Sequence, residues 1–483
     1  MKYGSFIGID FGTTNTAVVH IISDKLGSRI THLGDEGEYP FSSIVAIPKD
    51  GGPLLFGRYV RQQRQELSQT HDIYLSMKPY LGTDHEFIVG GHRYSAVDVT
   101  AEFLKYIKQY ISEHYSVRID RAAFSFPVDF SPAARRDLMK AAKKAGIEPA
   151  VFVSESTAAY IANRAEGRPF SRVIVIDWGG GTLDISILEL KQTKVYERSV
   201  WGERIGGDDI DKEFAQRVHA MISVDSSNGE RIKFEEMSPA QQDQLIMYCE
   251  RAKIDFSQYD DDYPLTVTNY GVYGTKTRMI PFDKFVQIIK PIVQKALATV
   301  EIALERARLT SASIDAVILV GGSSNLRPFA KAITQAFGRE KIILPDSAQW
   351  SVAEGAALMQ PIEGHFALND DVGVLLSDDS VYLVLEHNKD GVGSKAGPIT
   401  FSLTEDVPDA HFIFTNQDAS FPYARITVPT KGFLKEELKL SGSIGPDQIA
   451  VMIIDNSTMG VGQSKTIEIN KLTFHYDLAE LDA

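Results

Sequence analysis

IGIDFGTTNT, residues 7–16, is the stretch of sequence that decides the fold. Its apolar start is typical of a buried strand, and Asp10 stands where that strand ends. A tight turn at this point presents consecutive backbone N–H groups as a concave anion site, and Gly12 lets a phosphate come close to the backbone. Thr13 and Thr14 add hydroxyl donors, while Asp10 suits a hydrated Mg²⁺. We therefore expect a phosphate-binding turn here.

The same design recurs far along the chain as VIVIDWGGGTLD, residues 173–184. This copy again places an aspartate, Asp177, at the end of an apolar run, and a turn richer in glycine follows it. In both copies a second apolar run comes after the turn. Two such strand–turn–strand units predict two related halves that face one another.

Two further Gly-Gly turns stand just before expected helices, at residues 205–208 (IGGD) and 320–323 (VGGS). A helix N-terminus favours negative charge, so both turns could face a nucleotide. A lone Gly-Gly turn is usually only a backbone device. The joint pattern of two acidic strand ends and two Gly-Gly turns favours phosphate binding, although neither a Walker A sequence nor the Rossmann spacing is present.

The chain changes character near residue 364. Before it, strands alternate with helices, among them helices near 208–222, 239–256 and 282–309, the last interrupted at Pro291; this alternation predicts an α/β fold. After it, short strands separated by turn residues predict a β-sandwich. We therefore expect an α/β nucleotide-binding domain over residues 1–363, a linker over 364–371 and a β-sandwich over 372–483.

Composition excludes several classes of function. A net charge of -14 and a pI near 5.3 argue against a nucleic-acid surface, which needs Lys and Arg. The single cysteine, Cys249, excludes an intrachain disulfide. We find no signal-peptide pattern and no apolar run of about eighteen residues. The expectation is a cytoplasmic protein without a membrane or nucleic-acid partner.

Six stretches, taken in order, resemble motifs of the heat shock protein 70 (DnaK-type) family, of the actin-like ATPase superfamily: residues 7–16, 154–159, 176–184, 249–257, 318–323 and 345–346. The resemblance implies a two-lobed actin-like ATPase domain followed by a β-sandwich substrate domain. It implies slow ATP hydrolysis, with ATP/ADP and Mg²⁺ as cofactors and K⁺ as a further candidate ion.

By position, the family's catalytic roles fall on Lys78, Glu155, Asp177 and Asp10. Asp10 and Asp177 would hold Mg²⁺ through water, and which carboxylate orients the attacking water stays open. The resemblance assigns nucleotide contacts to Gly12, Thr13, Thr14, Asn15, Gly179, Gly180, Gly181, Thr182, Gly206, Gly207, Glu250, Lys253, Ser257, Gly321, Gly322, Ser323, Asn325 and Asp346. Pro127 and Arg135 resemble the pair that relays nucleotide state to the substrate domain.

The sequence departs from the family where two arginines commonly stack on adenine, because Ile254 and Asn325 occupy those positions. Each stacking contact is worth about 0.5–2 kcal/mol, so we expect modest ATP affinity and a relaxed base preference. No helical lid pattern and no acidic adaptor-binding tail follow the strands. A bound peptide would then be held only transiently.

Three functions remain open from the sequence. The first is an ATP-dependent, chaperone-like protein that binds extended peptide segments, with a co-chaperone as a candidate partner. The second is a nucleotide-dependent regulatory or scaffold protein whose β-domain binds one dedicated partner. A small-molecule kinase on the same scaffold ranks third, because nothing resembles a sugar or acid pocket.

Overall fold

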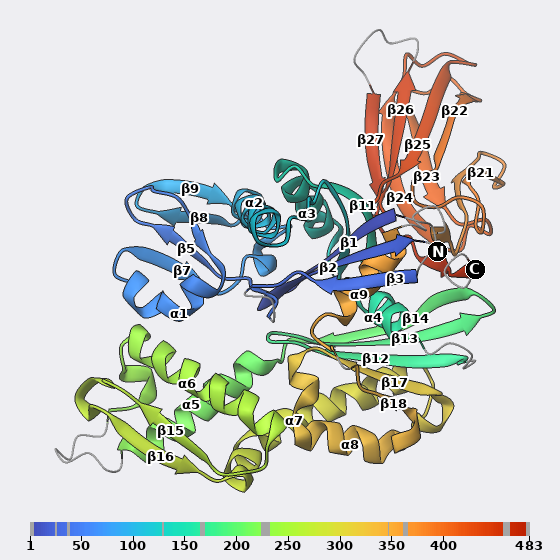
Figure 1. The fold of residues 1–483 in the computed structure, drawn as a ribbon. Coiled ribbons are helices and arrows are strands. Elements are labelled where there is room, and N and C mark those ends of the chain that lie inside the picture. Colours follow the sequence, from blue (N-terminus) through green and yellow to red (C-terminus); the bar gives the residue numbers. More distant parts are fainter. Residues whose placement is uncertain are drawn as a thin grey trace.

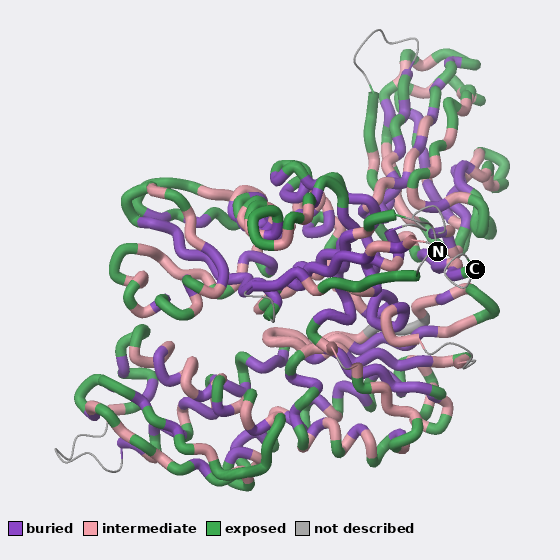
Figure 2. Tube along the Cα trace, in the orientation of Figure 1, coloured by how far each residue is buried: buried purple, intermediate pink, exposed green. Residues whose placement is uncertain are grey.

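The computed structural model describes residues 4–24, 27–35, 39–127, 130–164, 170–223, 232–345, 347–360, 366–456 and 464–479. These residues form two lobes with a sheet each and a β-sandwich beside them (Figure 1). Buried residues follow the strands of both lobes, and exposed residues concentrate at the periphery (Figure 2).

The first lobe is built on a sheet of order β11-β10-β1-β2-β3, with β4 paired to β2. Its strands are β1 (Gly4–Phe11), β2 (Asn15–Asp24), β3 (Gly27–His32), β4 (Phe41–Ser42), β10 (Arg121–Phe126) and β11 (Glu148–Ser154). Helices α2 (Ala96–Tyr115) and α3 (Pro132–Lys144) contribute buried side chains to the core of this lobe. An outer part holds β5 (Val45–Pro48), β6 (Leu55–Phe56), α1 (Gly57–Leu67), β7 (His71–Tyr74), the 3₁₀ turn η1 (Lys78–Tyr80), β8 (Glu86–Val89) and β9 (His92–Ser95).

The second lobe is built on a sheet of order β18-β17-β12-β13-β14-β28-β19. Its strands are β12 (Arg172–Trp178), β13 (Leu183–Lys191), β14 (Lys194–Glu203), β17 (Ala316–Val320), β18 (Ile342–Ile343), β19 (Phe366–Leu368) and β28 (Phe474–Asp477). The same lobe contains α5 (Gly207–Ser223), α6 (Pro239–Gln258), β15 (Tyr263–Val267), β16 (Lys276–Ile280), α7 (Phe282–Arg306), the 3₁₀ turn η5 (Gly322–Asn325) and α8 (Arg327–Phe337).

The two lobes repeat one topology. Strand β1 pairs antiparallel with β2 and parallel with β10. Strand β12 likewise pairs antiparallel with β13 and parallel with β17. The internal repeat in the sequence therefore corresponds to two hairpins of the same design, and each carries its acidic residue at the same end.

Helices α4 (Glu155–Asn163) and α9 (Ser351–Met359) lie between the two sheets (Figure 1). They share one apolar cluster with strands of both lobes, including Val151 on β11 and Val175 on β12. Close approach of the helices depends on Gly355, where an added Cβ would lie 1.8 Å from the carbonyl oxygen of Ala158. The helix pair thus joins the lobes and fixes where α4 begins.

The β-sandwich consists of sheets β21-β20-β23-β24 and β22-β25-β26-β27. Apolar side chains from both sheets, such as Phe414 and Leu440, form a single buried cluster. The strands are β20 (Val372–Leu375), β21 (Val381–Leu385), β22 (Lys395–Ser402), β23 (Asp409–Thr415), β24 (Pro422–Pro429), β25 (Glu437–Ile444), β26 (Ala450–Asn456) and β27 (Ser464–Ile469).

Three features differ from the expectations. The segment 364–371, expected to be a linker, contains β19, because Phe366 and Leu368 are both buried in the sheet of the second lobe. Strand β28 also leaves the sandwich and pairs with β14 of that lobe. Helix α7 runs through Pro291 without interruption, since buried residues on both sides of the proline, Ile289 and Val293, hold it against the core.

The close contact of α4 with α9 generates a stability prediction. We expect Gly355→Ala to lower the free energy of unfolding by about 1–3 kcal/mol, because the methyl group would collide with backbone that cannot move cheaply. Urea unfolding followed by circular dichroism would measure it. Gly52→Ala is the matched control, since the nearest atom to its added Cβ is 3.4 Å away. Equal stability of both variants would contradict the assigned packing.

Candidate functional site

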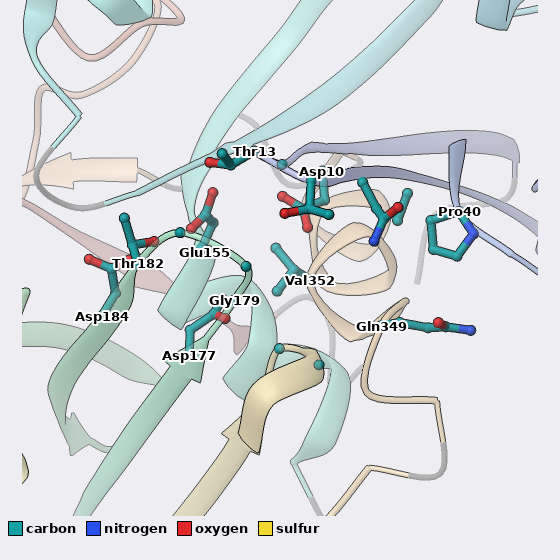
Figure 3. Close-up of a pocket in the computed structure, with 18 of the residues that line it drawn as sticks. Asp10, Thr13, Pro40, Glu155, Asp177, Gly179, Thr182, Asp184, Gln349 and Val352 are labelled. Atoms are coloured by element: carbon teal, nitrogen blue, oxygen red, sulfur yellow. The ribbon is translucent and has the colours of Figure 1, made fainter. Parts of the chain in front are cut away.

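The turn between β1 and β2 forms one wall of a cavity between the lobes (Figure 3). Ser125 on β10 donates to Oδ1 of Asp10 over 2.6 Å and so orients that carboxylate. Ser43 fixes the turn from behind: its Oγ donates to the carbonyl of Gly12 over 2.8 Å, and its N–H donates to the carbonyl of Thr14 over 2.9 Å. The turn is therefore held in shape before any ligand binds.

The turn between β12 and β13 forms the opposite wall. The N–H of Gly179 donates to the carbonyl of Thr182 over 2.9 Å, which closes the turn. Two neighbouring elements hold it, because Gly207 N–H and Ser323 Oγ both donate to the carbonyl of Gly179, over 3.0 and 2.8 Å. The turns also approach one another: a Cβ added to Gly180 would lie 2.0 Å from Oγ1 of Thr14 in the first turn. Any larger residue at position 180 would require Thr14 to move.

Four carboxylates line this cavity, from Asp10, Glu155, Asp177 and Asp184 (Figure 3). Asp177 and Asp184 are direct cross-strand partners, an arrangement that places like charges side by side. Burial, and then the neighbouring aspartates, raise the pKa of Asp177 to about 7. Burial also raises the pKa of Asp10 and, more strongly, that of Glu155. So much confined negative charge favours a site for a cation.

Lys78, the first residue of η1, supplies the positive charge that faces this cluster. Its Nζ lies 2.9 Å from Oε1 of Glu155, and both side chains are nearly enclosed. Burial alone would lower the pKa of Lys78, but Glu155 and Asp10 together raise it. The ammonium group is therefore charged and fixed where it can meet an anion.

A second cavity of about 750 Å³ adjoins the first and shares Thr14, Asn15 and Gly180 with it. This volume suits a small organic ligand. Ile254 on α6 lines it with 52% of its surface exposed, and Asn325 at the end of η5 lines it as well. The site thus has a small, charged end and a wider end with apolar surface.

Ion pairs join the lobes beside the wider cavity. Arg61 and Arg64 on α1 bond to Glu250 and Asp243 on α6. On the floor of the cavity, Lys253 Nζ lies 2.6 Å from Oδ2 of Asp211, which leaves the ammonium group fixed in place. The two pairs between α1 and α6 therefore bridge the lobes, whereas the pair of Lys253 with Asp211 lies within the second lobe.

The comparison with known families identifies the architecture. A model of the Hsp70 protein family matches residues 55–386, more than half of the chain. The chain belongs to the Hsp70 family. Its lobes therefore have the actin-like ATPase fold of that family, whose members are ATPases that use ATP or ADP with Mg²⁺. Among the described helices, none is long and apolar enough to cross a bilayer.

The structure brings most of the predicted site residues of this Hsp70 family member together. The charged cavity is lined by Asp10, Gly12, Thr13, Thr14, Asn15, Lys78, Glu155, Asp177, Gly179, Gly180, Gly181, Thr182, Gly321 and Gly322. The wider cavity is lined by Gly207, Glu250, Lys253, Ile254, Ser257, Ser323 and Asn325, among others. Gly206 lies behind the wall, where its N–H bonds to Asp209, and Asp346 falls outside the described residues.

Several lining residues were not among the predicted contacts. Asp184 could have been inferred, because it follows the glycine turn on β13 and pairs with Asp177 across the hairpin. Arg58 on α1 and Gln349, just before α9, also line the wider cavity. Tertiary packing alone brings these two residues to the site, and no pattern in the sequence indicates it.

The residues present fit a hydrated magnesium ion. Oxygen donors dominate the charged cavity, and Thr14 Oγ1 is buried without a hydrogen-bond partner among the described atoms. No group of His, Cys, Asp or Glu side chains within the described residues converges tightly enough to hold a metal directly. Magnesium usually keeps several waters and binds through phosphate oxygens, so Asp10 and Asp177 would contact it through water.

Of the two predicted relay residues, Arg135 lies near the sandwich. Pro127 follows β10, and Arg135 on α3 is buried with its guanidinium 5.1 Å from the ring centre of Phe126. Burial lowers the pKa of Arg135, and Asp447 from the sandwich opposes that shift. The neighbouring Arg136 reaches Asp447 across 3.8 Å. Arg135 is thus placed between the ATPase lobe and the sandwich.

Proposed function

We propose that this Hsp70 family member binds ATP across the two cavities, hydrolyses it slowly, and uses nucleotide state to control how the sandwich binds an extended peptide. The triphosphate and its magnesium would occupy the charged cavity, and the nucleoside would occupy the wider one. The observation that carries the proposal is the pairing of two hairpin turns around four carboxylates and one buried lysine.

The residues divide the chemistry between them. Backbone N–H groups of the glycine turns and the hydroxyls of Thr13 and Thr182 would bind phosphate oxygens. Lys78 would compensate charge that develops on the transferred phosphoryl group. Magnesium, when bound, would neutralise β- and γ-phosphate charge. Glu155 would orient a water for attack, and the direction of its carboxylate, which faces the same cavity from the start of α4, supports this role.

Contacts between the first lobe and the sandwich offer a route for control. The N–H of Phe152 donates to the carbonyl of Pro446 over 3.2 Å, close to the start of α4. Arg136 on α3 bonds to Asp447 and Glu468 of the sandwich. A change in the first lobe on nucleotide binding would alter these contacts and thereby bias the sandwich.

A second candidate function is a nucleotide-dependent scaffold with one dedicated partner. The sandwich is connected to the second lobe by both β19 and β28, which pair with each other at the edge of that lobe's sheet. Because both connections are part of the sheet, the sandwich would present the same surface at all times, as binding of one dedicated partner requires. Stimulation of ATP turnover by unfolded polypeptides would favour the first function, and a single co-purifying protein the second. Phosphate transfer to a small acceptor would indicate a kinase instead.

Two substitutions test the assignment of the charged cavity. We expect Lys78→Met and Glu155→Gln each to reduce the turnover number for ATP by about 100-fold, because each removes a group that acts on the reacting phosphate. Binding of ATP, measured by calorimetry in the presence of Mg²⁺, should persist in both. Lys140→Met is the matched control, because this lysine is exposed on α3. Full turnover in both variants would refute the catalytic roles.

A gain-of-function substitution tests the wider cavity. We expect Ile254→Arg to tighten ATP binding by about two- to thirtyfold, since a guanidinium there could stack on the adenine face. Calorimetric titration with ATP would measure the change. Ile302→Arg adds the same charge at an exposed position of α7 and should leave the affinity unchanged. An equal effect of both substitutions would mean that the base binds elsewhere.

A further inference from the structure

One carboxyl group near the site has no part in the chemistry described above. Glu197 on β14 is surrounded by hydroxyl groups: Ser156 and Thr157 donate to its Oε1 over 3.3 and 2.7 Å, and Ser154 donates to the same oxygen. Its described contacts are with these hydroxyls rather than with a cation. The Glu197 side chain is only partly buried, yet desolvation raises the pKa of its carboxyl group and the three hydroxyls oppose that shift, so this arrangement calls for an explanation.

The three hydroxyl residues flank Glu155 at the start of α4. Ser154 is the N-cap residue, and its Oγ accepts from the N–H of Thr157 over 3.2 Å. Glu155 itself turns the other way, toward Lys78 and the charged cavity. The carboxyl group of Glu197 is therefore hydrogen-bonded to the first turn of α4 on the side away from the cavity. The direction of the Glu155 side chain depends on the position of that turn.

A tyrosine from the C-terminal strand joins the same network. Tyr476 on β28 is almost fully buried, and burial and then the nearby Glu197 carboxylate raise the pKa of its hydroxyl. Gln448 of the sandwich approaches that hydroxyl at 3.4 Å and also donates to the carbonyl of Phe152 over 2.9 Å. The N-cap of α4 is thus held by Glu197 of β14, and Gln448 links Tyr476 of β28 to the backbone just before that N-cap.

We propose that Glu197 and Tyr476 are positioning residues for Glu155: they fix the N-cap of α4 and so hold the Glu155 carboxylate in the direction needed for ATP hydrolysis. The inference rests on the proposed ATPase function. Pairing of β28 with β14 would then be required for full turnover as well as for stability. Through this pairing, the C-terminal part of the chain would position the Glu155 carboxylate without contacting it.

Removal of the tyrosine hydroxyl is the sharpest test. We expect Tyr476→Phe to lower the turnover number by about three- to tenfold, because the hydroxyl that positions Gln448 against the backbone just before the N-cap of α4 is lost. The Michaelis constant and the calorimetric affinity for ATP should not change, since no phosphate or base contact is touched. Glu197→Gln, which keeps the shape, should lower turnover in the same way.

The matched control removes a hydroxyl elsewhere in the C-terminal part. Tyr423 donates to the carbonyl of Asp371 over 3.3 Å, inside the sandwich. Tyr423→Phe should leave turnover unchanged, and thermal unfolding of all variants would show that each is folded. Equal turnover in Tyr476→Phe and Tyr423→Phe would overturn the inference while leaving the ATPase function intact. Absence of turnover in the unsubstituted chain would overturn both.

A double variant separates positioning from a general structural effect. If Tyr476 acts through Glu155, adding Tyr476→Phe to Glu155→Gln should cause no further loss of single-turnover hydrolysis followed over hours. A purely structural role would lower the rate again by the same factor as in the parent chain. An additive loss would therefore overturn the inference.

Discussion

The structure depends on an electrostatic constraint between the lobes. Four carboxylates and one lysine share a cavity in which solvent screens their charges only weakly. The pairing of Lys78 with Glu155 relieves part of the repulsion, and the remainder favours the binding of a cation. Neither lobe forms this cavity alone, because Asp10 comes from one hairpin and Asp177 from the other. The charged site therefore exists only where the two lobes meet.

The repeated hairpin explains why the cavity has this form. Each strand ends in an aspartate and turns at glycine, so two copies facing each other bring acidic side chains and backbone N–H groups to one place. Helices α4 and α9 set the distance between the copies, and Gly355 permits their close contact. A small residue remote from the chemistry thereby controls the geometry at the cavity.

The sequence predicts the two glycine turns of this candidate site, because such turns depend on residues that are neighbours in the chain. The alternation of elements, the repeat and the glycine turns all follow from short-range patterns. The pairing of β28 with β14 and the approach of Arg58 depend on residues far apart in the sequence, and no local pattern encodes them. The expected linker was wrong for the same reason: Phe366 and Leu368 become a strand only because a sheet edge is available.

The placement of Glu197 shows how the C-terminal part can reach the site without touching the ligand. The carboxyl group of Glu197 accepts from the hydroxyls of Ser154 and Thr157, and so links β14 to the first turn of α4. Tyr476 on β28 contacts Gln448, which donates to the carbonyl of Phe152 just before that turn. If the inference holds, the order of the Glu155 carboxylate depends on how firmly that strand is held, and the sheet edge is then a physical link between the sandwich and the cavity.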